Sequence, residues 1–454
     1  MSGQVNIAAA LADGRVSLGI EFGSTRIKAC LVALDDPSLI IGVGGHAWAN
    51  SFVDRTWTYE LADAWTGAQA AYAEPAADRR QLGALGVSAM VRGYLAFDDA
   101  GEQLVPFRTW RNTSTGRAAA ELTETLGQNI PLRWSIAHLH QAVIDAEPHV
   151  ANVRFFTTLA GYVHWRLTGH KVLGVGDASG MFPIDSAAGD YDDELIARYD
   201  DLSRGQLPVP SVRTLLPQVL LAGQDAGTLS ASGAALLDPS GALQPGVPVC
   251  PPEGDAGTGM VATDSVAPRT ANVSAGTSIF AMVVLERPLA EVHHELDLVT
   301  TPAGDPVAMV HCNNGASELA AWVGMFTRFA AASGQSLTTD QVFEVLFREA
   351  LAADADAGGL LAYNYLAGEP LTGLAEGRPL FVRTPESDFT LANVMRAQLY
   401  GVFGTLALGM KVLESEGVAL ERMFAHGGIF RTAGVAQRLL AGALNAPVAV
   451  AETA

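Results

Sequence analysis

The sequence predicts an α/β protein built from two related domains. Its 454 residues are too many for one hydrophobic core, and apolar runs of strand length alternate with segments of helical periodicity. The chain also contains an internal repeat. An apolar β-hairpin with a small polar turn occurs at residues 16–34, around Gly23-Ser24-Thr25, and again at residues 270–284, around Gly276-Thr277-Ser278. Because such repetition implies related structural units, we expect each domain to contain one of these hairpins.

Other elements are expected in alternation along both halves. In the first half the patterns predict, in order, a strand at 38–48, a helix at 61–72, a strand at 82–90, a hairpin at 94–105, and helices at 114–126, 135–147 and 157–167. We expect no helix directly after Gly174-x-Gly176. In the second half the patterns predict helices at 317–332, 392–413 and 432–444, and a strand that enters the glycine turn at 427–428.

The two turn tips are candidate anion sites. Glycine permits the close approach that a phosphate needs, and the neighbouring hydroxyl and N–H groups are donors. Either tip alone is also compatible with an ordinary turn, but two copies favour a pair of loops that bind a polyphosphate. Lys28 follows the first tip, and we favour a solvated charge over a phosphate contact for it.

Composition narrows the class of protein. There are 28 Lys and Arg against 48 Asp and Glu, a net charge of −20, so no nucleic-acid partner is expected. The first fifteen residues lack the basic and long apolar regions of a signal peptide, and no apolar run is long enough for a membrane span. We therefore expect a cytoplasmic protein that does not bind membranes. The cysteines and histidines lack zinc-ligand spacing, so no structural metal is expected.

Seven segments, in the order in which a known family carries them, resemble the FGGY carbohydrate kinases, xylulokinase-like or ribulokinase-like enzymes of the actin-like ATPase superfamily. They are GIEFGSTRIKA at 19–29, RLTG at 166–169 with DASGMFPID at 177–185, PPEGDAGTGM at 251–260, SAGTS at 274–278, NNGAS at 313–317, YLAGE at 365–369 and HGGIF at 426–430. The resemblance covers nearly the whole chain.

The resemblance implies a fold and its division. It implies two actin-like, ribonuclease H-like domains, each a mixed sheet with flanking helices, and a cleft between them. Residues 1–262 would hold the sugar, the first phosphate loop and the catalytic base, and residues 263–454 would hold ATP. Family members continue past a segment like 443–450 with one more glycine-rich turn and a helix, so we expect the second domain to be short at its C-terminus.

The same resemblance implies roles for individual residues. Asp255 lies at the position of the catalytic base, although a carboxylate there also suits an Asx-type turn. Glu21, where most relatives carry aspartate, and Asp255 would organise a magnesium ion. The residues that would bind ATP are Gly23, Ser24, Thr25, Arg26, Gly276, Thr277, Ser278, Gly427 and Gly428. His426 stands where relatives usually have glycine and would crowd or stack on the nucleotide.

The sugar side departs from the pentulose-kinase pattern. Val91-Arg92-Gly93 stands where xylulokinases have methionine, histidine and glycine, and Trp110-Arg111-Asn112 stands where they have tryptophan, an acid and arginine. Arg92, Trp110 and Asn112 are therefore the candidate substrate contacts. Specificity would rest on their hydrogen bonds to hydroxyls.

These expectations converge on one activity. The chain would use ATP and Mg²⁺ to phosphorylate a sugar hydroxyl, on a ketopentose such as xylulose or ribulose or on a related sugar or polyol. Its partner would be that small molecule, and a homodimer is compatible with the family. The alternative is a non-catalytic nucleotide or sugar sensor on the same fold. An intact Asp255 argues against the sensor, and the sugar-side segments disfavour an actin-like assembly protein.

Overall fold

The computed structural model describes residues 7–74, 81–374 and 376–450. The chain separates into two compact units: Met1–Gly259 with Val299–Asp305, and Met260–Leu298 with Pro306–Ala454. The predicted division at residues 262 and 263 lies close to the end of the first long segment. The outer ends of the two predicted domains, 1–6 and 451–454, lie outside the described residues.

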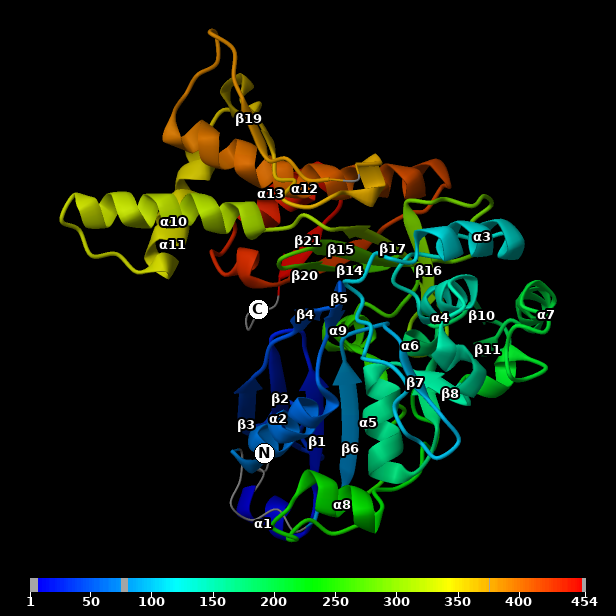
Figure 1. Ribbon diagram of the computed structural model, residues 1–454. Helices are drawn as coiled ribbons and strands as arrows, with labels where there is room; N and C mark the ends of the chain where they lie inside the picture. Colours follow the sequence, from blue (N-terminus) through cyan, green and yellow to red (C-terminus); the bar gives the residue numbers. More distant parts are fainter. Residues whose placement is uncertain (1–6, 75–80, 375, 451–454) are drawn as a thin grey trace. The chain divides into compact units, whose positions relative to one another are not determined.

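The main sheet of the first unit is mixed and, among the described residues, has five strands (Figure 1). Their order is β13 (Glu253–Gly254), β6 (Ala84–Ala89), β1 (Val16–Phe22), β2 (Arg26–Ala33) and β3 (Ile40–Ala47). The first three are parallel, whereas β1, β2 and β3 form an antiparallel meander. Alternate residues of β1 from Val16 to Phe22 are buried, as expected for a strand packed on one face.

The predicted first hairpin is confirmed. Phe22 pairs with Ile27 at the end of the β1–β2 ladder, and the Gly23 N–H donates to the Arg26 carbonyl at 3.0 Å. The three turn residues between these strands are therefore Gly23, Ser24 and Thr25.

The first unit contains further helices and strands, and the last of these helices, α9, continues into the second unit. They are α1 (Ile7–Ala12), β4 (Ser51–Val53), β5 (Thr56–Thr58), α2 (Leu61–Ala73), β7 (Leu95–Phe97), α3 (Gly116–Leu126), α4 (Ser135–Ile144), β8 (Phe155–Thr157), α5 (Leu159–Thr168), β9 (Val172–Gly174), α6 (Val175–Ala178), β10 (Ile184–Asp185), β11 (Asp190–Tyr191), α7 (Asp193–Leu202), β12 (Gln218–Leu220), α8 (Ala231–Leu237) and α9 (Asp255–Ala262). Helix α2 packs against β2 and β3, and α5 packs beside β6 (Figure 1).

Two local predictions in this unit need correction. The one-turn helix α6 begins directly after Gly174, where no helix was expected, because the Val175 carbonyl accepts a hydrogen bond from Ser179. The hairpin expected at 94–105 forms only in part. Strand β7 makes a single bridge to Gln103, and its ladder partner is β8.

The main sheet of the second unit repeats the arrangement of the first. Its strand order within the described residues is β16 (Leu296–Thr300), β17 (Pro306–Cys312), β15 (Ile279–Val284), β14 (Thr270–Ala275), β20 (Arg422–His426) and β21 (Val448–Val450). Strands β14, β15 and β17 form an antiparallel meander, and β20 and β21 continue the sheet in parallel beyond β14. The second predicted hairpin is thus confirmed, and it holds the same place in its sheet as the first.

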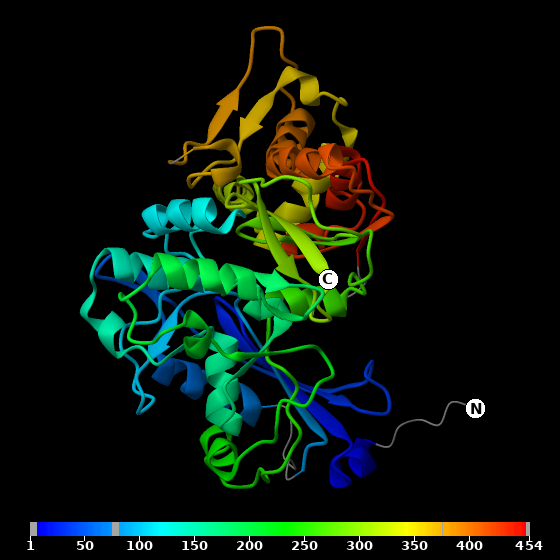
Figure 2. The ribbon, with the colours of Figure 1, turned by 90° about the vertical axis from the view of Figure 1, so that its right-hand side faces the viewer.

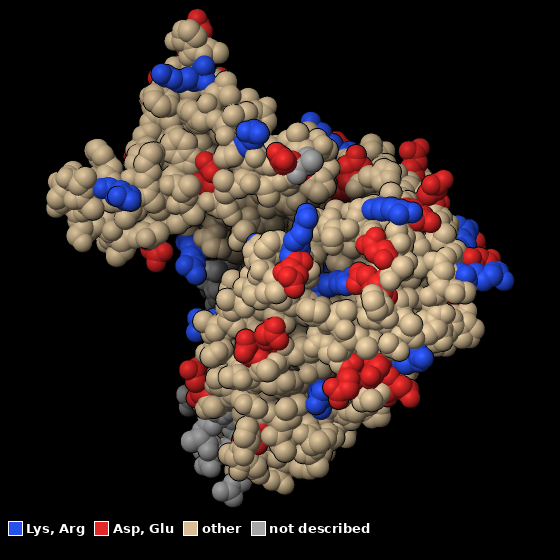
Figure 3. Space-filling view, in the orientation of Figure 1, with Lys and Arg blue, Asp and Glu red and all other residues tan. Residues whose placement is uncertain are grey.

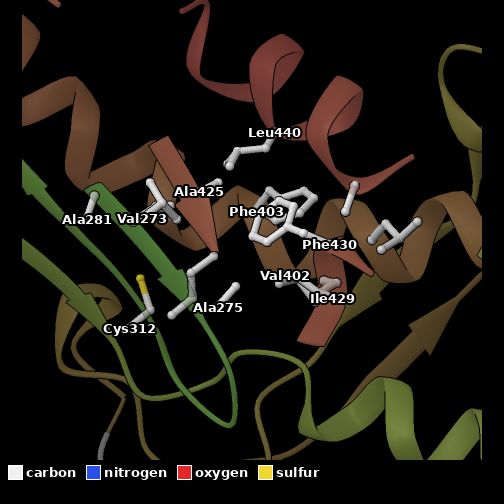
Figure 4. Close-up of a cluster of buried hydrophobic side chains, with 14 of the residues drawn as sticks. Val273, Ala275, Ala281, Cys312, Val402, Phe403, Ala425, Ile429, Phe430 and Leu440 are labelled. Carbon is white, nitrogen blue, oxygen red and sulfur yellow. The ribbon is translucent and has the colours of Figure 1, made fainter. Parts of the chain in front are cut away.

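Helices pack on the second sheet, and the apolar core of the unit is made of side chains from both the sheet and the helices. They are α10 (Ser317–Ala332), α11 (Thr339–Glu349), α12 (Leu391–Ser415) and α13 (Ala436–Leu444), and a small β18–β19 hairpin (Leu361–Tyr363, Leu380–Val382) completes the unit. Helix α12 lies between the sheet and this hairpin (Figure 2). Figure 4 shows Phe403 of α12, Ala425 of β20 and Leu440 of α13 pointing toward one another in the largest apolar cluster of the unit.

The tip between β16 and β17 belongs to the first unit. Within Val299–Asp305, the Thr300 N–H donates to the Ser179 hydroxyl at 3.2 Å, and the Thr300 hydroxyl donates to the Val175 carbonyl at 3.1 Å. The Pro302 carbonyl accepts from the Ala222 N–H at 2.8 Å. These hydrogen bonds join the seven residues Val299–Asp305 to the first unit.

On the face drawn in Figure 3, Asp and Glu side chains are interspersed with Lys and Arg and form no continuous basic surface. In the part of the chain that is described, no helix is long and apolar enough to cross a membrane.

Candidate functional site

The candidate site of the first unit lies at the carboxyl ends of three parallel strands. Glu21 is the penultimate residue of β1, and the turn at Gly23 follows that strand. Strand β6 is followed by Val91 and Arg92, and β13 is followed by Asp255. Parallel strands place their carboxyl ends on one edge of a sheet, so these residues converge although Val91 and Asp255 are 164 positions apart. The Val91 N–H donates to an Asp255 carboxylate oxygen at 3.2 Å, which ties two of the three ends together.

Asp255 is a carboxyl with a raised pKa at the end of a strand. It is the first residue of α9 and directly follows the two-residue strand β13. Burial raises the pKa of Asp255 to about 6, the Val91 N–H opposes this shift, and the negative charge of Glu21 adds to it. A carboxylate with such a pKa is ionised at neutral pH and is a stronger base than an exposed aspartate.

A buried pair of carboxyls supports this strand end from behind. Glu253 accepts the N–H groups of Gly176 and Asp177 at 3.1 and 2.9 Å. The Asp177 carboxyl in turn accepts the Thr158 hydroxyl at 2.6 Å. Burial raises the pKa of both carboxyls. The negative charge of Asp177 adds to the shift of Glu253, and that of Asp255 adds to the shift of Asp177. Neither residue was singled out from the sequence, because a carboxyl inside a strand or helix pattern carries no signal of its partner.

Residues 48–59 hold the first turn from one side. The indole Nε1 of Trp48 donates to the Gly23 carbonyl, and the Tyr59 hydroxyl donates to the Ser24 carbonyl, both at 2.6 Å. The Trp48 backbone N–H donates to the Thr25 carbonyl at 3.2 Å. Ser24 and Thr25 themselves are exposed. The sequence contained no sign of these bonds.

Charged residues flank the turn. Lys28 Nζ lies 2.9 Å from a Glu21 carboxylate oxygen, opposite it in the β1–β2 register, so Lys28 is an ion-pair partner rather than an isolated solvated charge. The Arg26 guanidinium packs over Gly45 of β3, where a Cβ would come within 2.7 Å of its Nε. A contact between Arg26 and phosphate stays a prediction.

The three predicted substrate contacts have different surroundings. Arg92 is buried with a positive φ of 71°, and its N–H lies 3.5 Å from an Asp177 carboxylate oxygen. Trp110 is half-buried. The Asn112 side-chain amide accepts the Trp57 N–H at 2.8 Å and donates to the carbonyls of Trp57 and Thr109 at 2.9 and 3.1 Å. Asn112 therefore organises the backbone around β5, and its contact with a sugar stays a prediction.

The second unit carries the matching turn, residues 276–278, between β14 and β15. The Gly276 carbonyl accepts the Ala316 N–H, and the Thr277 carbonyl accepts the Gly315 N–H, both at 2.8 Å. Gly315 is required at this approach, because a Cβ would lie 2.5 Å from the Gly276 oxygen. Gly276 and Thr277 are exposed.

An amide–carboxylate network holds the segment that supports this second turn. Both the backbone N–H and the side-chain Nδ2 of Asn314 donate to one Glu369 oxygen, at 3.2 and 3.0 Å. Asn364 Nδ2 donates to the carbonyls of Asn314 and Gly315 at 3.0 and 2.9 Å. The NNGAS and YLAGE segments thus bind each other behind the turn, a contact that the sequence did not predict.

The glycines after β20 lie at the same edge of the second sheet. Ser274 pairs with His426 in the parallel β14–β20 ladder, which brings Gly427 and Gly428 close to the turn after β14. Gly427 has a φ of 117°, and a Cβ on it would lie 2.1 Å from the Ala275 oxygen, so only glycine fits. His426 Nε2 lies 3.3 Å from Asn272 Oδ1, and burial lowers the pKa of the histidine.

Comparison with known families decides the class of the protein. The FGGY family of carbohydrate kinases has two characteristic domains. The profile of its N-terminal domain matches residues 16–262, and the profile of its C-terminal domain matches residues 271–454.

The chain belongs to the FGGY family of carbohydrate kinases.

Known relatives agree with this assignment. The chain is 22% identical over 359 residues to a protein named xylulose kinase from Haemophilus influenzae, a match that covers 76% of the chain and 67% of that protein. Among solved structures, xylulose kinase from Rhodospirillum rubrum matches with a TM-score of 0.78 and 22% identity, covering 96% of this chain and 86% of the other. Gluconate kinase from Lactobacillus acidophilus matches with a TM-score of 0.75 and 15% identity over the same shares of the two chains. The expected α/β kinase fold and the expected enzyme class are confirmed.

The residues of this FGGY kinase are compatible with the magnesium ion that generally accompanies ATP in the family. Within the described residues there is no cluster of three or more His, Cys, Asp or Glu side chains that could hold a metal by itself. Magnesium bound to a nucleotide needs only one or two protein carboxylates, because phosphate oxygens and water complete its shell. Glu21, whose side chain is 37% exposed, and Asp255 supply carboxylates at one strand edge.

Proposed function

We propose that this FGGY kinase transfers the γ-phosphoryl group of ATP to a hydroxyl of a ketopentose such as xylulose or ribulose, or of a related sugar or polyol. The observation that supports this proposal most strongly is Asp255, a carboxylate of raised pKa on the strand edge that also carries the first turn. Phosphoryl transfer needs one base for the attacking hydroxyl, and otherwise mainly positioning and charge stabilisation.

The proposal assigns each group a part in the reaction. Asp255 accepts the proton of the attacking hydroxyl. The N–H and hydroxyl groups of Ser24 and Thr25, and those of Thr277 and Ser278, bind phosphate oxygens, and Gly427 and Gly428 give the adenosine access to backbone. Glu21 and Asp255 would hold Mg²⁺, which when bound would supply positive charge for the phosphates of ATP.

The substrate class is proposed from the named relatives. The Haemophilus influenzae and Rhodospirillum rubrum proteins are named xylulose kinases, which puts ketopentoses first. Solved structures of a gluconate kinase and a glycerol kinase share the fold, so sugar acids and short polyols are further candidate substrates. Arg92 and Trp110 are the residues proposed to contact the sugar. A cytoplasmic location and a homodimer complete the proposal.

A screen for ADP release tests this function. Purified protein with Mg²⁺ and ATP is offered ketopentoses, aldoses, pentitols, tetritols, gluconate and glycerol. We expect stimulation by one or two of them, and a fall in turnover of about 10²- to 10⁴-fold in Asp255→Asn with ATP affinity retained, because the amide cannot accept the proton. Full activity in Asp255→Asn would overturn the assignment of the base. ATP binding without stimulation by any compound would favour the sensor instead.

A further inference from the structure

We infer that Trp48 and Tyr59 are positioning residues that turn the N–H groups of the first phosphate loop, Gly23-Ser24-Thr25, toward its ligand. This inference rests on the proposed function, in which the loop binds phosphate. It assigns a role in nucleotide binding to two aromatic side chains that belong to none of the segments that resemble the family.

Three successive carbonyls of the loop accept hydrogen bonds from residues 48–59. Gly23 accepts from the Trp48 indole, Ser24 from the Tyr59 hydroxyl, and Thr25 from the Trp48 backbone N–H. Two of the three donors are side-chain groups, and both of those bonds are 2.6 Å long. The carbonyl side of the turn is therefore fully engaged.

Because the peptide bond is planar, the hydrogen bonds to the carbonyls also fix the direction in which the N–H groups of the turn point. In a planar trans peptide the C=O of one residue and the N–H of the next point to opposite sides. With the carbonyls of Gly23 and Ser24 directed at Trp48 and Tyr59, the N–H groups of Ser24 and Thr25 point away from these rings. None of the hydrogen bonds among the described residues uses those two N–H groups or the two hydroxyls. Four donors of the turn are thus available to an anion.

The two aromatic donors are themselves held rigidly. Trp48 and Tyr59 are 9% and 3% exposed, and their rings stack with centroids 4.4 Å apart. The ring of Phe22 lies edge-on against Trp48 at 6.4 Å, and that of Phe107 lies 6.4 Å from Tyr59. A donor fixed in this way loses little entropy when the loop binds its ligand, which favours a preorganised site.

Phenylalanine variants separate the hydrogen bond from the ring. Trp48→Phe and Tyr59→Phe remove the donors but keep aromatic packing. The chain offers a matched pair of controls in the same unit: Trp65 donates to the Tyr162 hydroxyl at 3.1 Å, both residues are buried, and neither bonds the loop. Trp65→Phe and Tyr162→Phe therefore measure the general cost of the same two substitutions.

The measurements are calorimetric titrations of each purified protein with MgATP and with adenosine, thermal unfolding, and steady-state kinetics with the sugar found in the screen. We expect Trp48→Phe and Tyr59→Phe each to weaken MgATP binding by about 5- to 10-fold, the usual effect of one lost hydrogen bond. Adenosine affinity and the KM for sugar should stay within about twofold, because the loop contacts only phosphate. The KM for ATP should rise with the binding constant, and both controls should bind MgATP like the wild type.

Several outcomes overturn the inference. Loop variants that bind MgATP as the controls do would show that the bonds position nothing. Equal losses for MgATP and adenosine would indicate general damage to the fold. If the wild type binds no MgATP, the inference and the proposed function both fail. If the wild type binds MgATP but phosphorylates no sugar, only the kinase proposal fails, and the binding comparison still decides the role of Trp48 and Tyr59.

Discussion

The two phosphate-loop candidates occupy the same place in their sheets but are supported by different chemistry. The first turn has two of its carbonyls bonded by the side chains of Trp48 and Tyr59. The second has its carbonyls bonded by the backbone N–H groups of Gly315 and Ala316. A duplicated hairpin can therefore keep its shape while its support is replaced. Two bonds of the first support can each be removed by changing one side chain, whereas the two 2.8 Å bonds of the second come from the main chain, beside a longer bond of 3.4 Å from the Ser317 hydroxyl to the Thr277 carbonyl.

The strand edges beside the two turns also differ in charge. The first edge carries Glu21 and Asp255, with the buried carboxyls of Glu253 and Asp177 behind it. The second carries His426 against Asn272, a neutral pair at the pH where the first edge is ionised. This contrast agrees with the proposed functions of the edges, because a proton acceptor belongs on the side of the sugar and a neutral surface suits an adenosine.

The largest expected effect on nucleotide binding comes from moving the main chain behind the second turn. In Gly315→Ala the new Cβ would lie 2.5 Å from the Gly276 oxygen and 2.6 Å from the Ser278 carbonyl carbon, and both are backbone atoms with little room to shift. We expect MgATP binding to weaken by about 100-fold, as for a displacement of about 1 Å at a catalytic group. Stability should fall by about 1 to 3 kcal/mol from overpacking. Titration and thermal unfolding measure both quantities.

Gly324→Ala is the matched control for that variant. Gly324 lies on the exposed face of α10, and a Cβ there meets no atom within 4 Å. It should leave MgATP binding unchanged and add about 0.5 to 1 kcal/mol of stability, because alanine favours a helix. Unchanged nucleotide binding in Gly315→Ala would contradict a phosphate-binding role for the second turn.

An intermediate effect is expected on the pH dependence of stability. Asp255 and His426 should change the free energy of unfolding in opposite directions as pH rises. Asp255 has a folded pKa of about 6 against an ordinary value of 3.8, so its folded form favours the proton and stability is lost as pH rises from about 4 to 6. The full shift corresponds to about 3 kcal/mol, and partial exposure reduces our expectation to about 1 to 2 kcal/mol. His426 has a lowered pKa, so its contribution is present above its ordinary pKa and is lost as pH falls.

Thermal unfolding between about pH 4 and 8 tests these signs, with the Asp255 effect expected between about pH 4 and 6. Relative to the wild type, Asp255→Asn should gain stability as pH rises, and His426→Gln should gain it as pH falls. Parallel curves for the wild type and Asp255→Asn would mean that Asp255 is not perturbed in the folded protein.

The smallest expected effect comes from the exposed ion pair beside the first turn. The side chains of Lys28 and Glu21 are 53% and 37% exposed, and such pairs contribute little to stability. Lys28→Gln should change the free energy of unfolding by less than about 0.5 kcal/mol, measured by urea denaturation. If the same variant weakens MgATP binding as strongly as Tyr59→Phe does, the phosphate contact that we disfavoured for Lys28 would be the better interpretation.

The local features of the molecule could be predicted from the sequence. Both hairpins follow from β-branched and apolar runs around a small polar turn, and the helix expected at 317–332 is observed at Ser317–Ala332. The convergence of Glu21 and Asp255 also follows, once the strands before them are parallel. These features depend on patterns within about twenty residues, or on the general geometry of parallel sheets.

The supports behind the turns could not be predicted. A bond such as Tyr59 to Ser24 joins residues 35 positions apart, and periodicity does not say which carbonyl a hydroxyl will reach. The same limit applies to Asn112, expected at the sugar by its place in a motif but engaged with the backbone of Trp57. The segments that resemble the family include the turns and Asp255, but not Trp48 or Tyr59, whose bonds appear only in three dimensions.

The tip at Val299–Asp305 has a consequence for the order in which the chain acquires its structure during synthesis. Thr300 and Pro302 complete hydrogen bonds of Ser179, Val175 and Ala222, residues made roughly a hundred positions earlier. On the ribosome, these hydrogen bonds of the earlier unit can form only after residues 299–305 have emerged. In a fragment that ends at Gly259, these groups of Ser179, Val175 and Ala222 would lack the hydrogen-bond partners that residues 299–305 supply.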